Sequence, residues 1–225
     1  MVSFPVLVGL QMPELRANAT NAVALWPGSM SSAWGFRKYW ADVRDDLKRL
    51  LIPTFIGSSL GAVLLVYTSA EVFRIVVPIL ILGATLLLAF QKKLRTRRSG
   101  EVRTIARTPA AFLQLGISLY GGYFGAGMGI LMLSLLGLIA EGDIHRHNAI
   151  KNVLGLIINF TASAILLGKG LVEPLPGAAL MAGSIVGGYL ASHLSQKVPA
   201  EKLRVVIVCY GFLMTAWFAF RIFQS

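Results

Sequence analysis

The sequence predicts an all-α polytopic membrane protein made of two internal repeats of helical spans, with about seven hydrophobic segments and one glycine-broken helix. Of its 225 residues, 56% are hydrophobic and only 14% are charged, whereas a soluble domain carries roughly 25% charged residues. Seven uncharged runs approach or exceed the roughly 17–25 residues that span a bilayer. These runs are 17–36, 50–70, 75–91, 108–140, 152–168, 174–196 and 205–220. They leave no material for a soluble enzyme, a secreted disulfide scaffold or a nucleic-acid module.

Internal repetition organises these runs into two units. Three short motifs recur in the same order at offsets of 126 to 131 residues, and such a constant period indicates duplication. The matched motifs are Gly57-Ser58-x-x-Gly61 with Gly183-Ser184-x-x-Gly187, Ala70-Glu71-x-x-Arg74 with Ala200-Glu201-x-x-Arg204, and Asn21 with Asn152. We therefore predict a first transmembrane repeat over 1–91, a basic connector over 92–108 and a second transmembrane repeat over 109–225.

Each repeat contains three matching spans. An Asn-rich entry opens the first span, a Gly-x-x-x-Gly motif marks the second, and an Ala-Glu-x-x-Arg motif opens the third. Small residues four apart let helix backbones approach closely in lipid. The expected spans are 17–36, 50–70 and 72–91 in the first repeat, and 148–168, 174–196 and 201–221 in the second.

The run 108–140 is longer than one span needs, and residues 121–129 contain five glycines. Glycine is costly inside a helix, so this run is predicted to be a broken or re-entrant helix. Its counterpart in the first repeat would lie before residue 17, where only the short apolar segment 2–10 stands. We therefore expect that the chain starts late and lacks the first glycine-rich break.

The net charge of +11 is a topology signal rather than a sign of nucleic-acid binding. Seven basic residues fall within 92–108 and five within 37–49, and short Lys/Arg-rich loops remain cytoplasmic. We expect both connectors to be cytoplasmic, with anionic lipid headgroups as secondary partners. If 108–140 re-enters the membrane, the repeats are inverted; if it crosses once, they are parallel. The distribution of basic residues favours the inverted arrangement.

The glycine-rich break is the first candidate site. Gly125, Gly127 and Gly129 expose backbone N–H groups, and half-helix N-termini at the bilayer midplane attract anionic groups. The alternative is that these glycines only permit a kink or tight packing. Irregular backbone at membrane depth needs a cavity or protein cover, which favours a cavity.

Lys151 is the second candidate. Asn148, Lys151 and Asn152 share one helical face, as do Asn18 and Asn21 in the first repeat. Polar residues on one face of a spanning helix point to the interior. Two interpretations of Lys151 stay open: an anion-binding or gating charge, or a lysine that snorkels to the interface. These five residues and the three glycines form the predicted substrate site.

Other chemistry has little support. Asp143, His145 and His147 lie in a short connector without a further ligand cluster, so we predict no metal and no cofactor. No convergent nucleophile and base can be assembled, so the chain is not expected to be an enzyme. Asn159 is predicted to be an interhelical hydrogen-bond partner, and Cys209 an inert packing residue.

These motifs resemble the sulfite exporter TauE/SafE family, also called the four-spanner toluene sulfonate uptake permease family. The matching segments are 3–5, 17–23 with Pro27-Gly28, 121–129 and 147–152. The resemblance covers essentially the whole chain. It implies a multi-pass carrier in the bacterial inner membrane that transports sulfur-containing or organic anions such as sulfite or sulfonates, energised by an ion gradient. The chain departs from the family at its start.

The expected partners are a small anionic substrate and the lipid bilayer, with no nucleic acid, and the sequence allows a homo-oligomer. The alternative to a transporter is a truncated or accessory membrane subunit without transport activity of its own.

Overall fold

The computed structural model describes residues 2–96, 107–140, 144–194 and 200–223, and every regular element within these ranges is a helix. This confirms the predicted all-α class. The helices are α1 (Ser3–Gly9), α2 (Glu14–Gly35), the short 3-10 helix η1 (Arg37–Tyr39), α3 (Arg44–Tyr67), α4 (Ala70–Thr96), α5 (Arg107–Tyr123), α6 (Met128–Ile139), α7 (Ile144–Leu167), α8 (Pro174–Leu194) and α9 (Ala200–Phe223).

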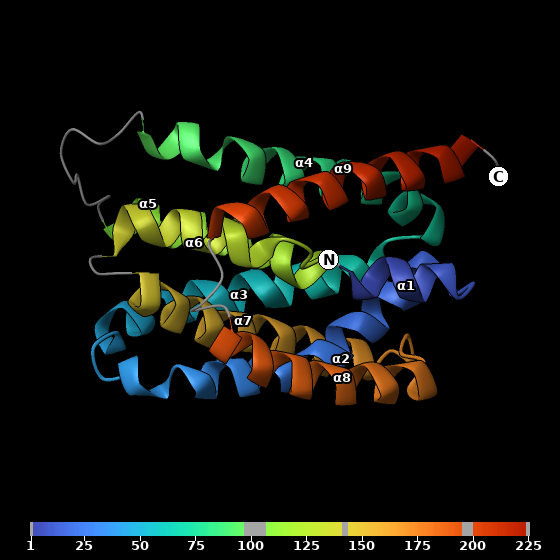
Figure 1. Cartoon of the computed structure of the whole chain (residues 1–225). Helices are drawn as coiled ribbons and strands as arrows, with labels where there is room; N and C mark the ends of the chain where they lie inside the picture. Colours follow the sequence, from blue (N-terminus) through green and yellow to red (C-terminus); the bar gives the residue numbers. More distant parts are fainter. Residues whose placement is uncertain (1, 97–106, 141–143, 195–199, 224–225) are drawn as a thin grey trace.

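The helices lie side by side as a bundle with two ends (Figure 1). We call one the basic end, at the left of Figure 1, where connector 36–43 joins α2 to α3 and where α7 begins. The other, which we call the far end, holds connector 168–173 between α7 and α8. Only part of the predicted basic connector is described: residues 92–96 continue α4, Arg107 opens α5, and 97–106 lie outside the described residues.

The helices that were matched by sequence run in opposite directions (Figure 1). α2, α8 and α4 run toward the basic end, whereas their counterparts α7, α3 and α9 run away from it. Hydrogen bonds between α2 and α7 support the opposite directions of this pair. The later residue of α2, Ser29, contacts the earlier residue of α7, Asn159, and the earlier Ala22 contacts the later Ser163. Opposite directions are what inverted repeats require. The division into repeats at 91 and 109 stays a prediction.

The long run 108–140 is a re-entrant pair of half-helices. α5 enters from the basic end, the chain turns over residues 124–127, and α6 returns to the same end (Figure 1). The predicted break is therefore confirmed, and the re-entrant alternative is the observed one. Glycine is needed at two positions of the turn: Gly125 and Gly127 have φ of +75° and +80°, a region that L-residues avoid.

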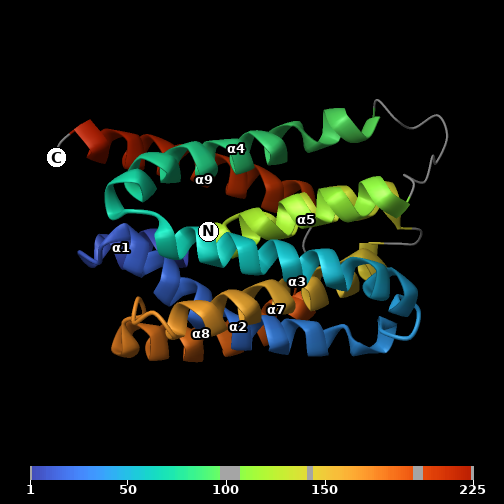
Figure 2. The same ribbon diagram turned by 180° about the vertical axis from the view of Figure 1, so that it is seen from behind.

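Glycines bring α3 and α5 into close contact, and Figure 2 shows these helices side by side. A Cβ on Gly57 would meet the carbonyl oxygen of Leu115, and one on Gly61 that of Leu119. On α8 the sequence counterparts differ, because Cβ atoms on Gly183 or Gly187 would meet nothing within 4 Å among the described residues. The repeated Gly-x-x-x-Gly motif therefore packs a helix in one repeat and lies exposed in the other.

Three described helices are long and apolar enough to cross a membrane: Arg44–Tyr67, Ala70–Leu87 and Ile144–Leu167, with mean hydropathies of 1.9, 2.1 and 1.7. Shorter apolar helices cover Met128–Gly137, Pro174–Leu190 and Val205–Arg221. α2 has 22 residues but is not among the three. Its polar residues Asn18 and Thr20 are 2% and 0% exposed, so α2 is an interior helix.

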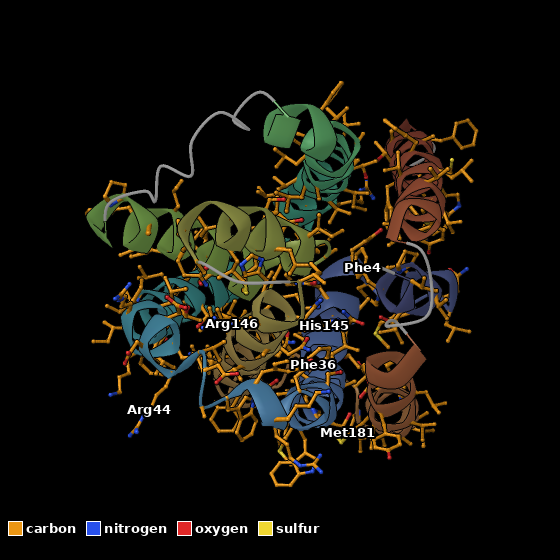
Figure 3. All side chains as sticks on the ribbon, turned by 60° about the vertical axis from the view of Figure 1, so that its left-hand side comes forward. Phe4, Phe36, Arg44, His145, Arg146 and Met181 are labelled. Atoms are coloured by element: carbon orange, nitrogen blue, oxygen red, sulfur yellow. The ribbon has the colours of Figure 1, made fainter. Side chains whose placement is uncertain are left out.

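α1 is a short helix that reaches from the middle of the bundle toward the far end (Figure 1). Phe4 stacks on Phe218 of α9 at 5.4 Å and meets Phe124 of the re-entrant turn edge-on at the same distance. Figure 3 shows Phe4 between these parts of the bundle. The aromatic contacts fix α1 next to the break, and the expectation of a missing upstream segment stays a prediction.

Candidate functional site

A cavity of about 410 Å³ lies where α2, α6, α7 and α8 meet. Its lining combines side chains and exposed backbone from both predicted repeats. The lining residues are Leu25, Gly28, Ser29, Ser32, Met128, Gly129, Met132, Lys151, Asn152, Gly155, Asn159, Ser184, Gly187 and Gly188. Three of the predicted site residues, Gly129, Lys151 and Asn152, are therefore brought together in one cavity.

Lys151 is the only charged side chain among the described residues that line the cavity. Its Nζ donates to Oδ1 of Asn148 at 3.0 Å. The Asn148 Nδ2 in turn donates to the Ile144 carbonyl at 2.9 Å, which turns the amide oxygen toward the ammonium. Asn148 does not line the cavity itself, and it positions the Lys151 ammonium from behind the wall through this hydrogen bond. The ammonium keeps two further hydrogens for a ligand.

The N-terminal end of α6 adds a second positive feature. Gly127 caps α6, and both Met128 and Gly129 of its first turn line the cavity. A Cβ on Gly129 would stand 3.5 Å from Cδ of Lys151, so the helix terminus and the lysine are neighbours. The N-terminus of a helix carries about half a positive charge. The two features together favour an anion.

The cavity wall has a polar and an apolar part. Hydroxyl and amide groups come from Ser29, Ser32, Asn152, Asn159 and Ser184. Leu25, Met128 and Met132 supply apolar surface, and Met132 is fully buried. The Ser29, Ser32 and Ser184 hydroxyls donate to the backbone carbonyls of Leu25, Gly188 and Ala24. A ligand that has acceptor oxygens would therefore bond the Lys151 ammonium and the amides, or a hydroxyl that exchanges its backbone partner for the ligand.

The remaining predicted site residues do not line the cavity. Asn18 is buried and donates from Nδ2 to the Tyr123 carbonyl at 2.9 Å, which satisfies the last residue of α5. The Oδ1 atom of Asn21 is buried without a hydrogen-bond partner among the described residues. Gly125 and Gly127 supply the backbone conformation of the break. Asn18, Gly125 and Gly127 therefore support the re-entrant helices rather than the cavity surface, and the structure gives Asn21 no such contact within the described ranges.

Replacing Gly127 should test how much the cap of α6 depends on its conformation. At φ of +80° an alanine costs about 1–2 kcal/mol, whereas asparagine tolerates this region better. We expect Gly127→Ala to lower the thermal stability of the detergent-solubilised protein more than Gly127→Asn does. A larger loss for Gly127→Asn than for Gly127→Ala would show that side-chain volume, not backbone conformation, decides this position.

The predicted connector histidines have structural partners at the basic end. Figure 3 shows His145 and Arg146 near Phe36. The His145 ring stacks on Tyr39 with centroids 5.9 Å apart, and His147 Nε2 lies 3.0 Å from the Ala140 carbonyl oxygen. Asp143 lies outside the described residues, and within them no three His, Cys, Asp or Glu residues are grouped for a metal.

Comparison with known proteins decides the family. The family model described as sulfite exporter TauE/SafE matches residues 1–218. The chain belongs to this family. It is 28% identical to a "Probable membrane transporter protein" of Haemophilus influenzae, over 98% of this chain and 89% of that protein. It is 26% identical to "Probable membrane transporter protein YfcA" of Escherichia coli K12, over 96% of this chain and 80% of that protein. No solved structure matches significantly.

Sequence reasoning missed several cavity residues of this TauE/SafE protein. On α2, Leu25, Gly28, Ser29 and Ser32 line the cavity. Their spacing of three, four and seven residues places them on one helical face, and this small, polar face was a usable signal. Asn159 was predicted as an interhelical hydrogen-bond partner, and its 2.8 Å bond from Nδ2 to the Ser29 hydroxyl confirms that role.

Proposed function

We propose that this protein is a secondary-active transporter that carries small sulfur-containing or organic anions, such as sulfite or sulfonates, across the bacterial inner membrane. The observation that carries the proposal is the cavity in which Lys151 lies beside the N-terminal end of α6. The names of the relatives support the coarser statement, a membrane transporter. The family description supports sulfite as the first anion to test.

The arrangement suits reversible anion binding. An anion that leaves water needs compensating charge and hydrogen bonds, and the cavity provides the Lys151 ammonium, a helix terminus, hydroxyls and amides. No carboxylate is among the described lining residues, so none repels the ligand there. A single cationic side chain favours binding that is strong enough for recognition and weak enough for release.

The orientation of the protein in the membrane is part of the same proposal. The basic end, which bears Arg37, Lys38 and Arg44, is assigned to the cytoplasm because Lys/Arg-rich connectors remain inside. Connector 92–108 is assigned to the same side. The chain is proposed to act without catalysis, and the ion gradient that energises it follows from the family resemblance.

Transport can be measured with the purified full chain in proteoliposomes. We expect uptake of radiolabelled sulfite or of a labelled alkyl sulfonate, reduced by an excess of the unlabelled anion and absent from protein-free liposomes. Imposed proton and sodium gradients, applied separately, identify the coupling ion. Folded, correctly reconstituted protein that moves no member of an anion panel under any gradient would contradict the proposal.

One observation favours a second candidate, an accessory membrane subunit. A Cβ added at Gly183 of α8, which does not line the cavity, would meet nothing within 4 Å among the described residues, although close helix packing is the usual use of this motif. An accessory protein would purify folded, transport no anion alone and gain transport when a second membrane protein is co-reconstituted.

A further inference from the structure

Hydrogen bonds join α2 and α7 on the side of the cavity that faces the far end. From the cavity toward the far end, the two helices are joined at successive levels. Asn159 Nδ2 donates to the Ser29 hydroxyl at 2.8 Å. The Ser163 hydroxyl lies 3.3 Å from the Ala22 carbonyl oxygen of α2 and 2.6 Å from the Asn159 carbonyl oxygen of its own helix, and so shares its hydrogen between them. Lys151 lines the same cavity nearer the start of α7.

This closure of the α2–α7 interface continues to the end of the bundle. The hydroxyl of buried Thr20 accepts a hydrogen bond from the backbone N–H of Glu173 at 2.9 Å. Arg16, one turn earlier on α2, forms an ion pair with the Glu173 carboxylate. The whole N-terminal part of α2 is therefore bonded to α7 and to the connector that follows it. Any route from the cavity to the far end between α2 and α7 has to break these contacts.

The cavity ends, and the hydrogen-bonded part of the α2–α7 interface begins, at Asn159 and Ser29. Both side chains line the cavity, and they bond to each other. Asn159 lies eight residues after Lys151, about 12 Å farther along α7. A ligand that enters from the Lys151 side reaches this pair last. The pair is neutral, and hydrogen bonds to an ionised acceptor are roughly twice as strong as neutral ones.

We propose that the Asn159–Ser29 hydrogen bond is the gate on the cavity side of this closure and the first of its contacts to open. It opens when an oxygen of the bound anion accepts the amide hydrogen that Asn159 gives to Ser29, and the contacts nearer the far end follow. The Ser29 hydroxyl can then donate to the same anion instead of to the Leu25 carbonyl, which it contacts at 3.0 Å. The trade replaces neutral hydrogen bonds with charge-assisted ones. This inference rests on the proposed anion transport.

Bridging the gate tests the proposal. In a Cys209→Ser background, which removes the free cysteine, the pair Ser29→Cys and Asn159→Cys places two thiols where the hydrogen bond stands. Cd²⁺ binds paired thiolates as soft ligands, so we expect Cd²⁺ to cause loss of sulfite transport in proteoliposomes and EDTA to restore it. Both substitutions also remove groups that line the cavity, so transport is compared with and without Cd²⁺ in the same preparation of this variant rather than with the wild type.

The matched control is the pair Phe160→Cys and Ala164→Cys, two exposed positions four residues apart on α7 that take no part in the α2–α7 hydrogen bonds, so Cd²⁺ can bridge them only within one helix. Cd²⁺ should change transport by this pair, and by each single variant, far less than transport by the Ser29/Asn159 pair. Undiminished transport by the bridged Ser29/Asn159 pair would overturn the gate while leaving the transporter intact. Failure of the wild type to transport or bind any anion would overturn the proposed function itself.

A second measurement covers the case in which the paired variant is inactive without Cd²⁺. Ala22→Cys, in the Cys209→Ser background with Ser29 and Asn159 unchanged, lies beyond the gate next to Ser163. Addition of sulfite should accelerate its reaction with a hydrophilic maleimide in detergent micelles, because the gate opens. A labelling rate that sulfite leaves unchanged, in protein that binds sulfite, would overturn the proposal.

Discussion

Replacing Lys151 by glutamine is expected to weaken anion binding strongly while the protein stays folded. The change removes the only charge among the described cavity residues and keeps a side chain of similar length. A hydrogen bond to a charged group contributes about 1.5–3 kcal/mol, which corresponds to about a 10- to 150-fold rise in Kd. Isothermal titration of the solubilised protein with sulfite and with a sulfonate measures the change, and transport should fall with it.

Lys169→Gln is the matched control, because this lysine is exposed in the turn after α7 and does not line the cavity. Its affinity for the anion should equal that of the wild type. Lys151→Arg retains the charge and should keep part of the binding. Unchanged affinity in Lys151→Gln would return this residue to the alternative interpretation, a lysine that only snorkels to the membrane interface.

The second large effect concerns the two copies of the Gly-x-x-x-Gly motif. Gly57→Ala should destabilise the protein, because the new Cβ would meet the Leu115 carbonyl oxygen and lie 2.9 Å from Cβ of Ser118. Backbone cannot yield without separating α3 from α5, and overpacking of this kind costs about 1–3 kcal/mol. Gly183→Ala, at the sequence counterpart on α8, meets nothing within 4 Å among the described residues.

For Gly183→Ala we expect unchanged or slightly higher stability, since alanine is favoured over glycine in a helix by about 1 kcal/mol. Unfolding in mixed micelles, followed by circular dichroism on both variants, measures the difference. A loss of stability in Gly183→Ala similar to that in Gly57→Ala would show that the α8 face is covered in the isolated protein, as it would be in a homo-oligomer.

The helical class, three of the expected spans and the break were predictable because each rests on local chemistry. Long uncharged runs indicate segments that lie in a bilayer. The glycines of 121–129 indicate a backbone that does not remain helical throughout. The grouping of Gly129, Lys151 and Asn152 followed from the expectation that broken helices and polar faces meet in the interior. The structure places all three on one cavity.

The rest depended on packing between distant segments. Ser29 and Ser184 join the cavity only because α2 and α8 lie together, with the Ser184 hydroxyl donating to the Ala24 carbonyl at 2.7 Å. Asn18 shared the polar face that suggested binding, but its amide satisfies the Tyr123 carbonyl where α5 ends. Sequence periodicity shows that an amide faces inward. It does not show whether the partner of that amide is a ligand or a backbone carbonyl left without a helical hydrogen bond.

The interior position of α2 has a consequence for biogenesis. Its polar groups find their partners 105 to 160 residues later in the chain, at Tyr123, Asn159 and Ser184. During synthesis α2 therefore reaches the translocon before any of these partners exists, and it is less apolar than α3, which follows it directly. The polar contacts of α2 can therefore be completed only after α7 and α8 have emerged, so the final packing of the second helix of the chain is a late event of assembly.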